Sequence, residues 1–148
     1  MPSDFVSLVI DPTTSTTVYV PTSSHGVYKS IDGGGSWTPI NSGLPPVSSR
    51  LPASVCVYSL VIDPTTSNRL YVSTTSGVYK SIDGRASWTC HCLKHYGQVY
   101  GGILSIDPTT PTILYAGNNK SIDGGATWQP INWTVDGFSL GVRSHATG

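Results

Sequence analysis

The chain has 148 residues, about the length of one domain, and only 11% of them are charged, against roughly 25% in an average globular protein. Serine and threonine make up about a quarter of it, with 16 glycines and 11 prolines, and this composition excludes a helical bundle. The net charge of zero argues against a nucleic-acid partner, and the apolar runs are far shorter than the ~20 residues of a membrane span.

The first part of the chain predicts a four-stranded antiparallel unit. The β-rich stretch 6–10 ends at Asp11-Pro12, because proline cannot donate to a ladder and Asp-Pro starts a turn. We expect further strands at 16–20, 27–31 and 36–40, the last of them ending in a turn cluster of Asn, Ser and Gly.

The same pattern returns twice more along the chain. The motif Leu-Val-Ile-Asp-Pro-Thr-Thr begins at Leu8 and recurs from Leu60 and, with one substitution, from Leu104, at offsets of 52 and 44 residues. A Gly-Val-Tyr-Lys phrase at 26–29 and 77–80 follows, of which only Lys120 survives in the third copy. Four strands in about 40–50 residues is the size of a propeller blade. We therefore predict an all-β chain of three four-stranded antiparallel repeats, with blades at about 5–43, 55–97 and 100–133.

Each repeat closes with a Ser-Ile-Asp phrase that ends in tryptophan. The positions that define these phrases are Ser30, Asp32, Gly34 and Trp37, then Ser81, Asp83 and Trp88, then Ser121, Asp123, Gly125 and Trp128. They resemble the Asp-box, or bacterial neuraminidase repeat (BNR), of sialidase, sortilin-type, xyloglucanase and photosystem II assembly-factor propellers. The resemblance implies a β-propeller with the box at the hairpin between the third and fourth strands of each blade. Together with the composition it favours an extracellular location, although the first residues show no secretory signal.

The chemistry of a tight turn predicts a structural role for the box. An aspartate at the start of the turn accepts hydrogen bonds from backbone N–H groups that the turn leaves unpaired. The glycines allow positive φ, and the tryptophan buries its ring between neighbouring sheets. Arg85 stands where the other two boxes have Gly34 and Gly125, so a positive φ at this position would strain the middle turn.

The residue inventory predicts no catalytic site. A sialidase-like site needs an arginine cluster, a tyrosine nucleophile and a glutamate, but the four arginines are scattered and the chain has no glutamate. Xyloglucanase-like hydrolysis uses two aspartates, and only Asp4 and Asp136 lie outside the Asp-Pro turns and the boxes. A fragment of a glycoside hydrolase is the alternative function.

The three cysteines give one local candidate for a metal site. Cys90, Cys92 and His95 lie close together in a segment that departs from the other repeats, and Cys56 would have to come from another strand. Structural zinc sites usually leave at least two residues between ligating cysteines, which this segment does not. We therefore expect no metal or other cofactor and interpret the segment as drift from the repeat.

Closed propellers usually have 4–8 blades, which predicts that these three blades assemble further. Residues 138–142 resemble 5–9, so the tail 134–148 is interpreted as containing the first strand of a further blade. We expect two copies to complete a ring of six blades, with this chain as its own partner. A filament, a protein or carbohydrate ligand, and a degenerate reading frame cut from a longer propeller gene are the alternatives.

Overall fold

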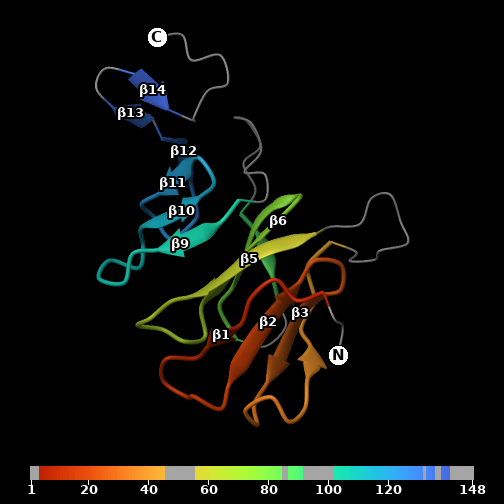
Figure 1. Cartoon of the computed structure of the whole chain (residues 1–148). Helices are drawn as coiled ribbons and strands as arrows, with labels where there is room; N and C mark the ends of the chain where they lie inside the picture. Colours follow the sequence, from red (N-terminus) through yellow and green to blue (C-terminus); the bar gives the residue numbers. More distant parts are fainter. Residues whose placement is uncertain are drawn as a thin grey trace.

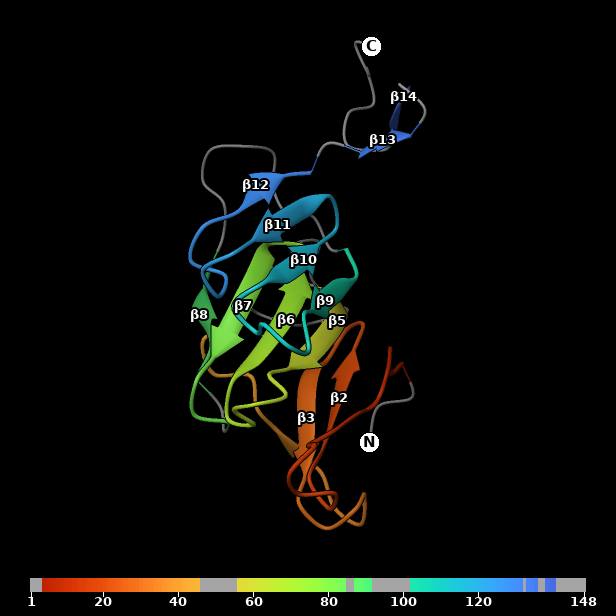
Figure 2. The same cartoon turned by 90° about the vertical axis from the view of Figure 1, so that its left-hand side faces the viewer.

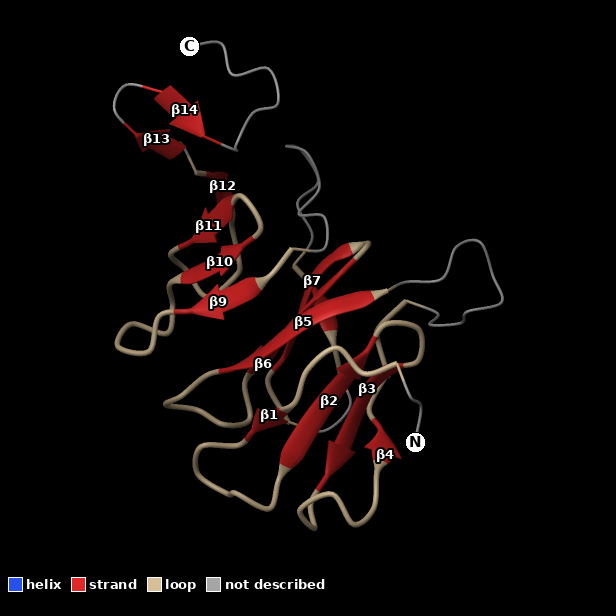
Figure 3. Cartoon of the chain, viewed as in Figure 1, coloured by secondary structure: helices blue, strands red, loops and turns tan. Residues whose placement is uncertain are grey.

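A computed structural model describes residues 4–45, 56–84, 87–91, 102–131, 133–135 and 138–140. Every regular element in these residues is a β-strand (Figure 3). The strands form three four-stranded antiparallel sheets and one two-stranded sheet, which confirms the predicted all-β class. None of these segments is a helix long and apolar enough to cross a membrane.

The three four-stranded sheets are simple meanders, in which each strand pairs with the next one along the chain. We call them the first, second and third blade. The first blade contains β1 (Val9–Ile10), β2 (Val18–Thr22), β3 (Gly26–Ser30) and β4 (Thr38–Pro39). The second contains β5 (Val57–Ile62), β6 (Leu70–Thr74), β7 (Gly77–Ser81) and β8 (Thr89–Cys90). The third contains β9 (Leu104–Ile106), β10 (Leu114–Ala116), β11 (Asn119–Ser121) and β12 (Gln129–Pro130).

The first strand of the first blade is shorter than the predicted stretch 6–10. Val6 donates its N–H to the Pro21 carbonyl at 2.8 Å, so the polar backbone groups of that position face β1. Pro21 has no N–H to return the bond, and the regular ladder is limited to Val9 and Ile10. Ser73 occupies the corresponding position of the second blade, where β5 extends over six residues.

The three blades stack in chain order, with the second between the other two (Figures 1 and 2). One apolar cluster joins the first and second blades, and a second cluster joins the second and third. Each blade therefore has a leading face, toward the blade that precedes it, and a trailing face, toward the blade that follows. A single sheet cannot bury both of its faces alone. The first and third blades cover the two faces of the second blade.

The remaining two strands form a hairpin that follows the third blade. β13 (Trp133–Val135) pairs antiparallel with β14 (Phe138–Leu140), and in both views the hairpin lies at the β12 end of the stack (Figures 1 and 2). Residues 141–148 lie outside the described part of the chain. The interpretation of the tail as the start of a fourth blade stays a prediction.

Candidate interaction faces

The first Ser-Ile-Asp turn is closed by its own side chains. Asp32 Oδ1 accepts hydrogen bonds from the Ser30 hydroxyl at 2.7 Å and from the Ser36 N–H at 2.8 Å. Asp32 Oδ2 accepts one from the Ser36 hydroxyl at 2.7 Å. The Gly34 N–H donates to Ser30 Oγ at 2.8 Å, so the Ser30 hydroxyl accepts a bond from the backbone and donates one to the carboxylate.

The third turn repeats this arrangement. Asp123 Oδ1 accepts from the Ser121 hydroxyl and from the Thr127 N–H, each at 2.8 Å, and Asp123 Oδ2 accepts from the Thr127 hydroxyl. In the second turn, Asp83 accepts from the hydroxyls of Ser81, at 2.9 Å, and of Ser87. The three turns lie between the third and fourth strands of their blades, as the family resemblance implied.

These hydrogen bonds hold the carboxylates in the charged form. The Ser36 hydroxyl, followed by the Ser30 hydroxyl, lowers the pKa of Asp32 to about 2. The Thr127 hydroxyl and backbone N–H lower the pKa of Asp123 to about 2 in the same way. A hydrogen bond made to the charged form favours that form, and it occupies the lone pairs that another ligand would need.

The glycine that follows the box aspartate by two positions adopts positive φ where it is described. The φ angle is 97° at Gly34 and 89° at Gly125. Arg85 and Ala86 lie outside the described residues, so the strain expected at the middle turn stays a prediction.

The Asp-Pro aspartates form a second set of turns. Asp11, Asp63 and Asp107 each accept hydrogen bonds at Oδ1 from the N–H and hydroxyl of the threonine two positions on and from the N–H of the next residue. Asp63 also accepts a hydrogen bond from Arg69 at 3.0 Å. Burial acts to raise the pKa of Asp63, but the bonds from Thr65 and Thr66 and the charge of Arg69 outweigh it and lower the pKa.

Asp4, one of the two remaining aspartates, lies against the β2–β3 hairpin. Its Oδ2 accepts hydrogen bonds from the Ser23 hydroxyl at 2.9 Å and from the Ser24 N–H at 2.8 Å, and His25 Nδ1 lies 3.2 Å from its Oδ1. The Ser24 hydroxyl is the largest cause that holds the pKa of Asp4 well below its usual range. Asp136 lies outside the described residues, so the structure does not place the two carboxylates relative to each other.

The candidate metal ligands are only partly placed. Cys90 is exposed on β8, while Cys92 and His95 lie outside the described residues, and Cys56 is a free thiol. Among the residues that are described, no three metal-ligating side chains come together.

A recurring contact that the sequence analysis missed joins successive blades. Lys29 Nζ donates to the Gly84 carbonyl at 2.7 Å, and Lys80 Nζ donates to the Gly124 carbonyl at 3.1 Å, so each lysine binds the box turn of the following blade. Each ammonium also lies over a tyrosine ring of its own blade, 5.4 Å from the centre of Tyr19 for Lys29. The sequence held one signal for this contact, the recurrence of the lysine in all three repeats. A charge is not expected to recur at a position that only packs in an apolar core.

Two further hydrogen bonds, one at each interface, accompany the lysine contact. Trp88 Nε1 donates to the Ile40 carbonyl at 2.6 Å, between the first and second blades. The Tyr71 hydroxyl donates to the Gly124 carbonyl at 3.2 Å, between the second and third. Burial between the blades raises the pKa of Tyr19 to about 12 and that of Tyr71 above its ordinary value.

The leading face of the first blade is open. Leu60 and Leu104, on the leading faces of the second and third blades, are each 4% exposed, whereas the corresponding Leu8 is 60% exposed. Trp88 and Trp128 are buried, whereas Trp37 is only half-buried. A groove of about 500 Å³ lies on this face, lined by Phe5, Val6, Ser7, Leu8, Val20 and Trp37.

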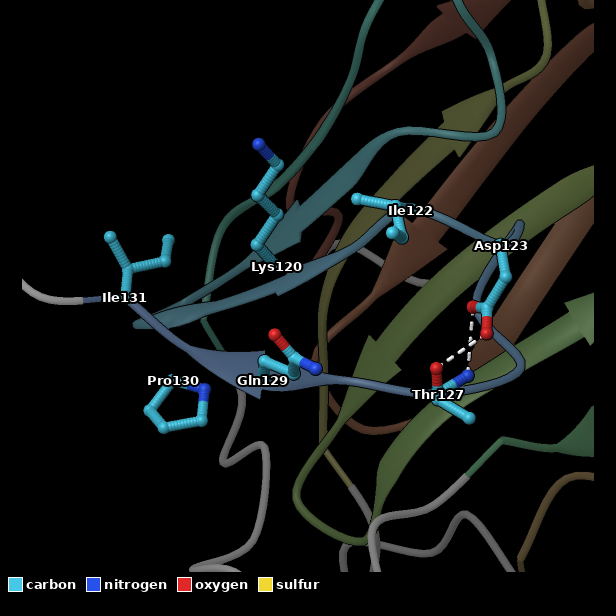
Figure 4. A pocket seen from close by; sticks show the side chains of 7 residues that line it. All are labelled: Lys120, Ile122, Asp123, Thr127, Gln129, Pro130 and Ile131. Atoms are coloured by element: carbon cyan, nitrogen blue, oxygen red, sulfur yellow. Dashed lines mark hydrogen bonds between the residues drawn. The ribbon is translucent and has the colours of Figure 1, made fainter.

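The trailing face of the third blade is open as well. Tyr19 and Tyr71, on the trailing faces of the first two blades, are each 1% exposed, whereas the corresponding Tyr115 is 36% exposed. Lys120, from β11, lines a groove of about 450 Å³ and lies between Ile131 at one end and Ile122 and Asp123 toward the other (Figure 4). Similar grooves lie beside Lys29 on the first blade and Lys80 on the second, so this groove is a feature of every blade.

Comparison with known proteins gives matches among solved structures only; no protein-family model and no curated protein matches the chain. An ancestral GH74 enzyme superposes with a TM-score of 0.64 at 19% identity, over 89% of this chain and 19% of its own. The GH74 enzyme of Niastella koreensis gives 0.60 at 22% identity, over 86% of this chain and 22% of its own. The protein U3-55K gives 0.60 at 14% identity, over 85% and 38%.

The chain spans about a fifth of the length of the two GH74 enzymes. At these identities the likeness establishes the fold and not the activity. The three stacked four-stranded meanders therefore belong to the β-propeller class of folds, and this chain contributes three blades of that class.

Proposed function

We propose that the chain is a non-catalytic β-propeller module that works by binding and assembly through its two open faces. The observation that carries this proposal is the difference between equivalent residues: Leu8 and Tyr115 are exposed, while their counterparts between blades are buried. Contiguous exposed apolar surface on a soluble protein marks an interaction site more often than it marks chance exposure.

The three closed turns also support assigning the chain to the Asp-box propellers. Each pairs a serine hydroxyl with a carboxylate two residues on, and each lies between the third and fourth strands of its blade. On this proposal the box residues hold turns, and binding is a property of the faces and grooves between blades.

Light scattering after size exclusion tests the assembly. Two chains of 15.7 kDa would associate into a particle of about twice that mass, which is the result we expect at micromolar concentration. Larger species would support an open assembly of the same faces. A monomer across the whole concentration range would overturn the proposal, because the open faces would then be stable in water.

The likeness to GH74 enzymes favours a second candidate, a fragment of a glycoside hydrolase. Against it, a catalytic acid needs a carboxyl that stays protonated near neutral pH, whereas the pKa of Asp4 is lowered by hydrogen bonds from Ser24 and Ser23. Release of reducing sugar from a panel of β-glucans, abolished in both Asp4→Asn and Asp136→Asn, would establish this candidate in place of the first.

A further inference from the structure

The two interfaces inside the stack share one polar contact, from a lysine to the carbonyl of the glycine that follows the box aspartate. This contact occurs between Lys29 and Gly84 and again between Lys80 and Gly124. Hydrogen bonds from a charged donor are stronger than neutral ones, and desolvation between sheets strengthens them further. The contact therefore defines which face of one blade fits which face of the next.

The third blade presents the donor side of this contact already assembled. Lys120 Nζ lies 5.6 Å from the centre of the Tyr115 ring, against 5.3 Å for Lys80 and Tyr71. Within the described part of the chain, neither Lys120 Nζ nor the Tyr115 hydroxyl donates a hydrogen bond, and the contact between them is that of the ammonium with the ring. The donors are held as they are at the internal interfaces: Lys120 is half-buried like Lys29 and Lys80, whereas Tyr115 is exposed where its counterparts are buried.

The first blade presents the acceptor side. Gly33 has a φ of 68°, close to the 61° of Gly84 and the 69° of Gly124, so the three turns share a left-handed φ at this point. Gly84 and Gly124 are buried, and the carbonyl of each accepts a hydrogen bond from the preceding blade, whereas Gly33 is exposed. No donor among the described residues bonds its carbonyl.

A second pair of groups is complementary in the same direction. Trp88 donates to the carbonyl of Ile40, and the corresponding groups at the two ends are Trp37 and Ile131. This contact is present at one of the two internal interfaces, because Trp128 Nε1 has no described partner. Trp37, which lines the apolar groove of the first blade, thus corresponds to the donor of the bond, and the Ile131 carbonyl of the third blade corresponds to its acceptor.

Building on the proposed function, we infer that the partner is a second copy of this chain, docked head to tail. The trailing face of the third blade of one copy covers the leading face of the first blade of the other, with Lys120 and Tyr115 donating to the Gly33 carbonyl. Such a contact joins two different surfaces, so two copies close a ring through two identical contacts, or copies add without closing.

Mixing two blocked variants tests the direction of docking. Leu8→Glu places a charge on the leading face and Tyr115→Glu places one on the trailing face, at residues that are exposed within one chain. We expect each variant alone to be a monomer and their equimolar mixture to form a one-to-one dimer, because each supplies the face that the other lacks. If either variant still dimerises alone, or if the mixture stays monomeric while the parent dimerises, head-to-tail docking is wrong.

Lysine variants test the contact itself. We expect Lys120→Met to raise the dissociation constant of the dimer about tenfold to hundredfold, the scale of a hydrogen bond from a charged donor, and Lys120→Arg to raise it less. Lys29→Met is the matched control, because it removes the same contact inside the stack and should lower the unfolding midpoint of the single chain. The dissociation constants are measured by sedimentation velocity across a dilution series.

The outcomes separate the two proposals. A parent chain that never associates overturns the proposed function and this inference together. A parent that dimerises as tightly with Lys120→Met and Tyr115→Phe as without them leaves the proposed function standing and overturns the lysine contact alone.

Discussion

The interface between the first two blades and the open face of the first blade are built from the same repeated residues, but only one of them is covered. At the interface, Leu60 packs with Trp88 against Tyr19 and Val27 of the preceding blade. On the open face, the corresponding Leu8 lines a groove that no described residue fills. The side chains are alike, so the difference lies in what stands opposite them.

This difference shows that the contribution of a repeat position to stability depends on the blade that packs against it and not on its residue type alone. Full burial of a leucine stabilises a fold by about 1.5–3 kcal/mol relative to leaving it exposed. Leu60 and Leu104 make that contribution within one chain, and Leu8 makes it only when another blade covers it. Repeat proteins have this property in general, since each unit contacts only its neighbours.

The largest expected effect comes from placing a charge at the two leucines. Leu60→Asp puts a carboxylate between two sheets, which costs at least about 4 kcal/mol and leaves a chain of ordinary stability largely unfolded. Leu8→Asp, in the exposed counterpart, should change the free energy of unfolding of the dilute chain by about 0.5 kcal/mol or less. Urea unfolding followed by circular dichroism measures both. Equal losses in the two variants would mean that the first blade is covered within the single chain.

The tryptophans give the next largest contrast. Trp88→Ala should cost about 3–5 kcal/mol, because it removes a buried ring and leaves the Ile40 carbonyl without its donor. Trp37→Ala should cost about 1 kcal/mol, since that ring is half-exposed and bonds no described acceptor. Trp128 is a control of intermediate kind, because it is buried but its Nε1 has no described partner. A cost at Trp37 equal to that at Trp88 would contradict the comparison.

The local structure of the blades was predictable from the sequence because it is set by local chemistry. The Asp-Pro turns end the first strands, and the second-strand tyrosines and the Ser-Ile-Asp turns recur in register with the sheets. The boundaries of β1 and β4 were predicted too long. Regular pairing of β1 depends on a donor that Pro21 lacks, and the predicted stretch 36–40 pairs regularly only at Thr38 and Pro39.

The interfaces between blades were not predictable in the same way. Tyr71 and Tyr115 hold the same place in the repeat, and only the third dimension makes one buried and the other exposed. Lys29 and Lys80 end the recurring Gly-Val-Tyr-Lys motif, and nothing in that motif indicated that each would bond a backbone carbonyl of the next blade. A contact to backbone leaves no trace in residue identity on the accepting side, except that the acceptor is a glycine with positive φ.

A smaller effect is expected at the glycines of the first and third boxes. Both have positive φ, so replacement by alanine costs about 1–2 kcal/mol at either position. At Gly125 the new Cβ would also lie 3.3 Å from the Tyr71 ring of the preceding blade, whereas at Gly34 it would meet only Trp37 of its own turn, at 3.6 Å. We therefore expect Gly125→Ala to be the more destabilising by about 1 kcal/mol, as measured by thermal unfolding. Equal losses of stability in the two variants would show that the Tyr71 ring moves aside from the new methyl group at no cost.

The smallest expected effect concerns the box aspartates, which should behave alike on the open leading face of the first blade and on the covered leading face of the third. Asp32 and Asp123 both have their pKa lowered from 3.8 to about 2 by hydrogen bonds within their own turns. A lowered folded-state pKa means that the unfolded chain binds more protons between about pH 4 and pH 2, so stability is present above that window and is lost as the pH falls through it.

Ser36→Ala removes the largest cause of the shift at Asp32, and Thr127→Val removes it at Asp123. Each should move the pKa of its carboxyl, followed by NMR, back toward 3.8. Because these bonds close within one turn, the two variants should behave alike, although the glycines of the first turn are exposed and those of the third are buried against the second blade. A clearly larger response at Asp123 would show that the neighbouring blade, and not the turn alone, holds the charge.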